Sequence, residues 1–109
     1  MNYKTIIPEG KDYAALVTEL RYAVASARAS GEELVIINIP DNDDVQSKKT
    51  KTLIIRILKT MKKEGLIQFY ATGESFESLT TEARFLLNKY PQIISDSQKD
   101  SADILYAKI

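Results

Sequence analysis

Residues 28–39, Arg-Ala-Ser-Gly-Glu-Glu-Leu-Val-Ile-Ile-Asn-Ile, decide the fold because they join the end of a helix to a buried strand. The same pattern returns at residues 61–71, Met-Lys-Lys-Glu-Gly-Leu-Ile-Gln-Phe-Tyr-Ala. Each stretch has a cationic helix end, a glycine suited to the left-handed conformation that ends helices, and a short apolar strand. Two such units in one chain indicate alternating helices and strands.

The rest of the chain extends this alternation to four strands and three helices. Strands are predicted at 3–7, 34–39, 66–71 and 104–108, and helices at 12–30, 47–64 and 76–90. The strand 34–39 is almost wholly apolar, so we expect it to be central and covered on both faces. The prediction is one α/β domain over residues 1–109: a βαβαβαβ sandwich with a mostly parallel sheet of four strands, order 4-1-2-3, and helices on both faces. The long polar loop at 95–101 leaves an antiparallel last strand open as the alternative.

The composition excludes several classes of function. The 109 residues include no His, Cys or Trp, so the usual metal ligands, thiol nucleophiles and neutral-pH acid–base groups are missing. Fifteen acidic and fifteen basic side chains cancel, so no overall field attracts nucleic acid or an anionic membrane. No segment approaches the ~18 apolar residues of a membrane span. We expect a cytoplasmic protein with no cofactor, no metal and no catalytic residues, and the sequence argues against an enzyme.

The predicted helix 47–64 carries the strongest local signal. At about 100° per residue, seven of its cations fall on one arc of roughly 160°, and no acidic side chain precedes Glu64. These cations are Lys48, Lys49, Lys51, Arg56, Lys59, Lys62 and Lys63. Such a surface predicts contacts with phosphates, the main source of affinity in sequence-independent nucleic-acid binding. The alternative is a solvated helix face whose lysines favour the negative end of the helix dipole.

Two loops at the carboxyl ends of the second and third predicted strands form another candidate site. The residues concerned are Asp41, Asp43 and Asp44 in one loop, and Thr72, Gly73 and Ser75 in the other. Ligands of open parallel sheets bind at this edge. The carboxylates could hold Mg²⁺, and the hydroxyls with free N–H groups could hold phosphate. The alternative is that all six serve as turn residues and helix caps.

The leading prediction for function is a non-catalytic interaction module that binds a protein partner or a second copy of itself. The chain has six tyrosines, and exposed tyrosines are common at protein interfaces. Tyr22 lies off the apolar stripe of its helix, whereas Tyr13 lies on the stripe and is expected in the core. Nucleic-acid binding through helix 47–64 is the first alternative. The second is Mg- or phosphate-dependent activity at the two loops.

Overall fold

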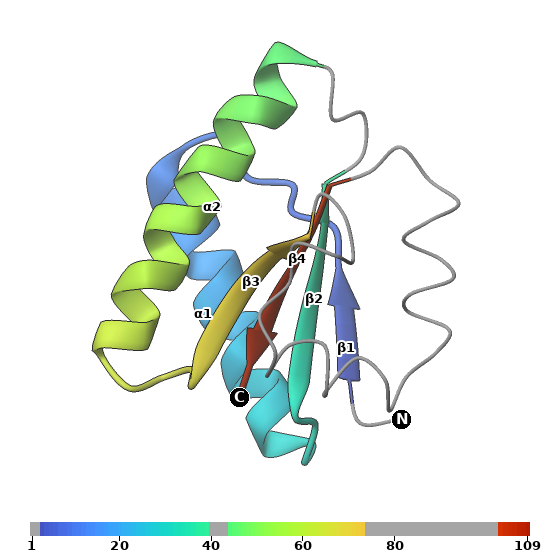
Figure 1. Cartoon of the computed structure of the whole chain (residues 1–109), viewed down its shortest axis with the longest axis vertical. Helices are drawn as coiled ribbons and strands as arrows, with labels where there is room; N and C mark the ends of the chain where they lie inside the picture. Colours follow the sequence, from blue (N-terminus) through green and yellow to red (C-terminus); the bar gives the residue numbers. More distant parts are fainter. Residues whose placement is uncertain (1–2, 40–43, 74–102) are drawn as a thin grey trace.

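The computed structural model describes residues 3–39, 44–73 and 103–109. Its strands are β1 (Tyr3–Ile6), β2 (Leu34–Ile39), β3 (Phe69–Gly73) and β4 (Asp103–Lys108), and its helices are α1 (Tyr13–Ala29) and α2 (Val45–Lys63) (Figure 1). The α/β class is thereby confirmed. The third helix, predicted at 76–90, lies outside the described residues.

Both helices end in the same hydrogen-bonded turn, built on the two glycines that the sequence singled out. Gly31 has φ 73° and Gly65 has φ 78°. In each turn the glycine N–H donates to the carbonyl three residues earlier, at 3.2 and 3.1 Å, and the next N–H donates to the carbonyl five residues earlier, at 2.9 Å in both. This pair of bonds defines the Schellman motif. The predicted helix–glycine–strand units are therefore present at both places.

The sheet has the strand order β1-β2-β4-β3. β1 runs parallel to β2, whereas β4 runs antiparallel to both of its neighbours. The predicted order 4-1-2-3 and the mostly parallel sheet are wrong, because β4 lies between β2 and β3 and makes the sheet mixed. The alternative of an antiparallel last strand is confirmed.

Burial explains the position of β4. Leu105 and Ala107 are fully buried towards the helices, and Tyr106 is buried on the opposite face. A strand covered on both faces needs an internal place in the sheet. β1 takes the edge instead, with Thr5 exposed and Lys4 donating from its Nζ to the Ser26 Oγ of α1 at 3.4 Å.

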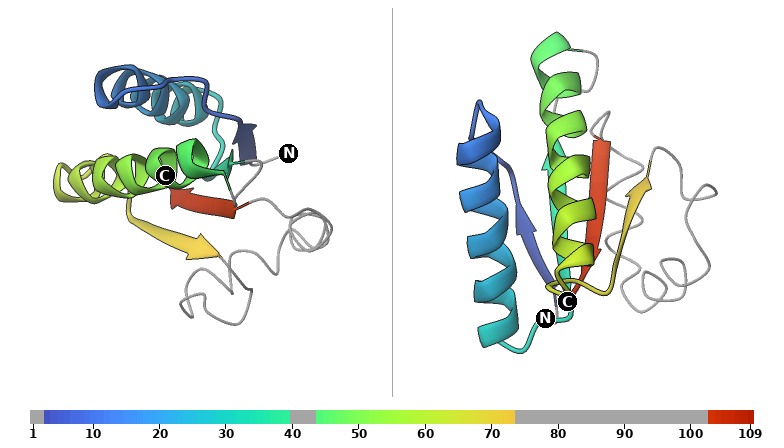
Figure 2. Two further views of the ribbon diagram at one scale, coloured as in Figure 1. Left: turned by 90° about the horizontal axis from the view of Figure 1, so that it is seen from above. Right: turned by 90° about the vertical axis from the view of Figure 1, so that its left-hand side faces the viewer.

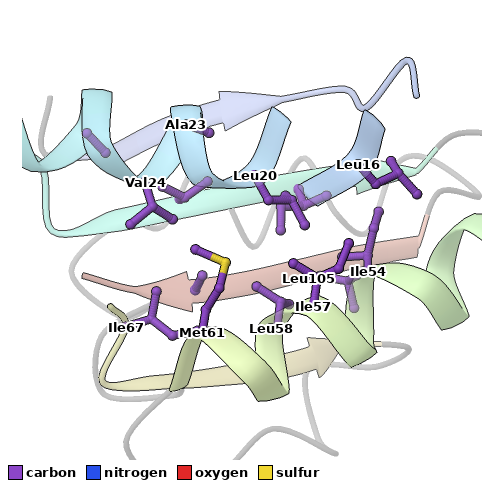
Figure 3. Close-up of a cluster of buried hydrophobic side chains, with 14 of the residues drawn as sticks. Leu16, Leu20, Ala23, Val24, Ile54, Ile57, Leu58, Met61, Ile67 and Leu105 are labelled. Atoms are coloured by element: carbon purple, nitrogen blue, oxygen red, sulfur yellow. The ribbon is translucent and has the colours of Figure 1, made fainter. Parts of the chain in front are cut away.

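The main core lies between the sheet and the two described helices. α1 and α2 cover the same face of the sheet (Figure 2). This agrees with the prediction, in which the helix on the other face was the one at 76–90. Side chains of both helices meet β2 and β4 in one cluster (Figure 3). β2 is internal as predicted, with Ile36 and Ile37 only 4% and 0% exposed. β3 begins at Phe69, later than predicted, because Leu66 completes the helix-ending turn and Ile67 is buried in the core cluster.

Candidate functional site

The cations of α2 form a solvent-facing surface, here called the basic face: Lys48, Lys49, Lys51, Arg56, Lys59, Lys62 and Lys63. The opposite side of the helix is fixed in the core by Ile54, Ile57, Leu58 and Met61. This packing settles the rotation of α2, so the cations project outwards as the helical spacing predicted. Lys51 is half-buried and the other six are exposed. At ~1.5 Å per residue, the basic face extends about 22 Å along α2, from Lys48 to Lys63.

The two helices run side by side in the same direction, and α2 is shifted along its axis relative to α1 (Figure 2). An offset of 43 residues separates Arg21 of α1 from Glu64 at the end of α2, and the same offset separates Tyr13 from Arg56. Tyr13 is the first residue of α1, so the segment 45–55 of α2 extends beyond α1. This part of α2 is about 16 Å long. The basic face therefore includes a protruding portion and a portion flanked by α1.

Arg56 lies where these two portions meet, and its guanidinium carbon is 5.7 Å from the centre of the Tyr13 ring. This is the geometry of a cation–π contact. Around it lies an open depression of about 460 Å³, which we call the Arg56 depression. Its walls are Tyr13, Arg56, Lys59, Thr60, Lys62, Lys63 and Tyr70. Four cations from α2 thus share one concave surface with an aromatic ring from α1 and another from β3.

Glu64, the C-cap residue that follows α2, is the first acidic side chain after the basic face in the sequence, and it is already engaged. Glu64 accepts two hydrogen bonds from the Arg21 guanidinium, at 2.9 and 3.0 Å. Both side chains are close to half exposed, so this ion pair adds little to stability. Its consequence is local, because the Glu64 carboxylate at this end of α2 is held towards α1. Apart from Lys51, the cations of the basic face have no ion pair in the part of the chain that the structure describes.

The two candidate loops do not form a site among the described residues. Asp44 is the N-cap of α2, and its Oδ2 accepts the Ser47 N–H at 3.3 Å. The cap interpretation is therefore correct for Asp44, and this carboxylate occupies the place that a phosphate would take at the helix N-terminus. Thr72 and Gly73 belong to β3, so the prediction that they lie in a loop is wrong. Asp41, Asp43 and Ser75 lie outside the described residues.

The described strands and helices also lack the crevice in which open sheets bind their ligands. Ligand sites of open sheets form where the strand order reverses and successive helices cover opposite faces. Here β1, β2 and β3 follow one another in a single direction across the sheet, and both connecting helices cover one face. In the described ranges, moreover, no three acidic side chains are grouped in a way that could hold a metal ion. Neither observation favours a Mg²⁺ or phosphate site at this edge.

Tyr13 was expected in the core, and this prediction is wrong. Its side chain is 42% exposed and lies under Arg56. Sequence reasoning therefore missed the aromatic part of the site, since Tyr13 and Tyr70 reach α2 only through the register of three separate elements. No spacing within helix 47–64 could have indicated them. Tyr22, which was expected off the stripe, is 73% exposed on α1.

No family model, curated protein or solved structure matches this chain. None of the described helices is both long enough and apolar enough to span a lipid bilayer.

Proposed function

We propose that this protein binds the phosphate backbone of nucleic acids through the basic face of α2. The observation that carries the proposal is the Arg56 depression, where four cations and two tyrosines from three elements share one open surface. Lysine and arginine side chains bind phosphates by releasing the counterions condensed on the nucleic acid. Aromatic side chains beside them offer surfaces on which bases stack. The sequence alone indicated only the cations.

The neutral total charge does not oppose this proposal, because the charges are unevenly distributed along the chain. Residues 45–63 contain seven basic and no acidic side chains, within a chain of fifteen of each. Association with a polyanion depends on the potential at the binding surface more than on the net charge of the whole molecule. The basic face supplies such a local potential.

The arrangement of the lysines supports a binding role over a merely solvated surface. On a helix, residues three or four positions apart are neighbours. Lys59 therefore lies next to three cations, namely Arg56, Lys62 and Lys63. Each like-charge pair of this kind destabilises a helix by about 0.2–0.5 kcal/mol. Bound phosphates would remove that repulsion, whereas solvent alone only screens it.

The test is a binding titration with labelled oligonucleotides at low salt, followed by fluorescence anisotropy. The double variant Lys59→Gln/Lys63→Gln should lose most of the affinity of the parent chain. Lys108→Gln is the control, because Lys108 lies on β4 and its strand position directs it to the face of the sheet opposite the helices. We expect Lys108→Gln to bind as the parent does. Absence of binding to any DNA or RNA at low salt would refute the proposal.

Tyr22 supports a second candidate function, the interaction module that the sequence favoured. A tyrosine that is 73% exposed in the middle of a helix offers a large amphipathic surface to a protein partner or to a second copy of the chain. If the chain self-associates through this surface, Tyr22→Ser should shift the sedimentation velocity profile towards the monomer. An unchanged profile would argue against a role of Tyr22 in self-association.

A further inference from the structure

We propose that the nucleic acid bound here is single-stranded, and that one of its bases stacks at the Tyr13–Arg56 pair. The proposal rests on the function proposed above and names the form of nucleic acid that the same site accepts. It is carried by the cation–π contact between the two side chains and by the place of that contact in the wall of the Arg56 depression.

The Tyr13–Arg56 pair is prepared for stacking before any ligand arrives. The Arg56 guanidinium carbon lies over the Tyr13 ring, 5.7 Å from its centre, so the flexible arginine side chain already has an aromatic partner. Both residues are exposed. Arginine planes and aromatic rings are the two kinds of surface on which unpaired bases stack. The same guanidinium can donate hydrogen bonds to a phosphate, since its N–H groups lie in its plane.

The neighbours of the pair supply the phosphate contacts for an adjacent nucleotide. Lys59 and Lys63 follow Arg56 along α2 and line the same depression. Successive cations at three- and four-residue spacing lie about 4.5–6 Å apart along the helix axis. A strand that follows α2 can therefore place a base on Arg56 and its next phosphates against these lysines.

The packing of α2 argues against a duplex at this place. The major groove of B-DNA is about 12 Å wide, which admits one α-helix. From Arg56 onwards, however, α2 has α1 beside it, because Arg56 lies over Tyr13, the first residue of α1. Two packed helices are about 18–22 Å across, given interaxial distances of 8–10 Å and diameters of 10–12 Å. In a duplex, moreover, the bases are already stacked on one another and are not free to stack at the Tyr13–Arg56 pair.

The chain contains no tryptophan, so a single introduced Trp is the only source of tryptophan fluorescence in the experiment. Tyr13→Trp places the reporter at the proposed stacking site. Tyr22→Trp is the matched control on the same helix, at a position that is 73% exposed and outside the walls of the depression. Each variant is titrated at low salt with oligo(dT), with a duplex of the same length, and with heparin, a polyanion without bases.

We expect oligo(dT) to quench the fluorescence of Tyr13→Trp and to leave Tyr22→Trp nearly unchanged. Tyr13→Ala should weaken the binding of oligo(dT) by about 5- to 150-fold, the range given by stacking of one base, and should alter the binding of heparin far less. Equal affinity for single strand and duplex, with Tyr13→Trp unquenched, would overturn this inference and leave the proposed function in place. No binding of either nucleic acid would overturn both.

Discussion

Replacing Lys59 and Lys63 by glutamine should halve the salt dependence of nucleic-acid binding. Each phosphate neutralised on a single strand contributes a slope of about −0.7 to log K against log salt. Four cations line the Arg56 depression, so one phosphate on each gives a slope of about −2.8 for the parent chain. Between 50 and 200 mM salt the affinity should fall about 50-fold, and a variant with two remaining contacts should lose only about 7-fold.

The assay is fluorescence anisotropy with a labelled oligonucleotide at four or more salt concentrations. Lys108→Gln should keep the parent slope, since it removes one charge from the other face of the sheet. Thermal unfolding of the double variant should be almost the same as that of the parent, because Lys59 and Lys63 are exposed and exposed charges contribute little to stability. A double variant that is weaker at every salt concentration but has an unchanged slope would refute the reasoning. It would mean that Lys59 and Lys63 do not contact phosphates.

Two predictions concern the fold that positions the basic face. Gly65→Ala should destabilise the protein by about 1–2 kcal/mol, the cost of a left-handed conformation, because φ is 78° there and an added Cβ meets nothing within 4 Å. In urea unfolding, Gly65→Asn should recover part of this loss. A cost near zero for Gly65→Ala would contradict the left-handed conformation of Gly65. Ile37→Ala should cost about 2–5 kcal/mol, since the side chain is 0% exposed on an internal strand; a loss below 1 kcal/mol would mean that β2 is not central.

The helix–glycine–strand units could be predicted because their determinants are local. A glycine after a cationic helix end leads to the same turn whatever surrounds it, and both Gly31 and Gly65 adopt the left-handed conformation. The outward direction of the basic face was predictable for a similar reason. Helical spacing alone separates its cations from the apolar side of α2, which the structure places in the core.

The order of the sheet could not be predicted in the same way, because it depends on contacts between distant segments. The segment 104–107 is as apolar as an internal strand requires. Its short length and the polar loop that precedes it, however, equally allowed a place beside β1. The Tyr13–Arg56 contact could not be predicted for the same reason, because it also joins distant segments. It depends on how far α2 slides along α1, and neither helix encodes that displacement in its own spacing.

The insertion of β4 between β2 and β3 has a consequence for how the protein is made. On the ribosome β2 emerges well before β4, the strand that pairs with its second edge. Ile39, for example, pairs with Asp103, which is synthesised much later. At translation rates of about 5–20 residues per second, the apolar strand spends several seconds with one side unpaired. During this interval it resembles the exposed edge that favours aggregation. Chaperones that bind short apolar segments should therefore meet the nascent chain at residues 34–39, and slowing translation upstream of residue 103 should lower the soluble yield.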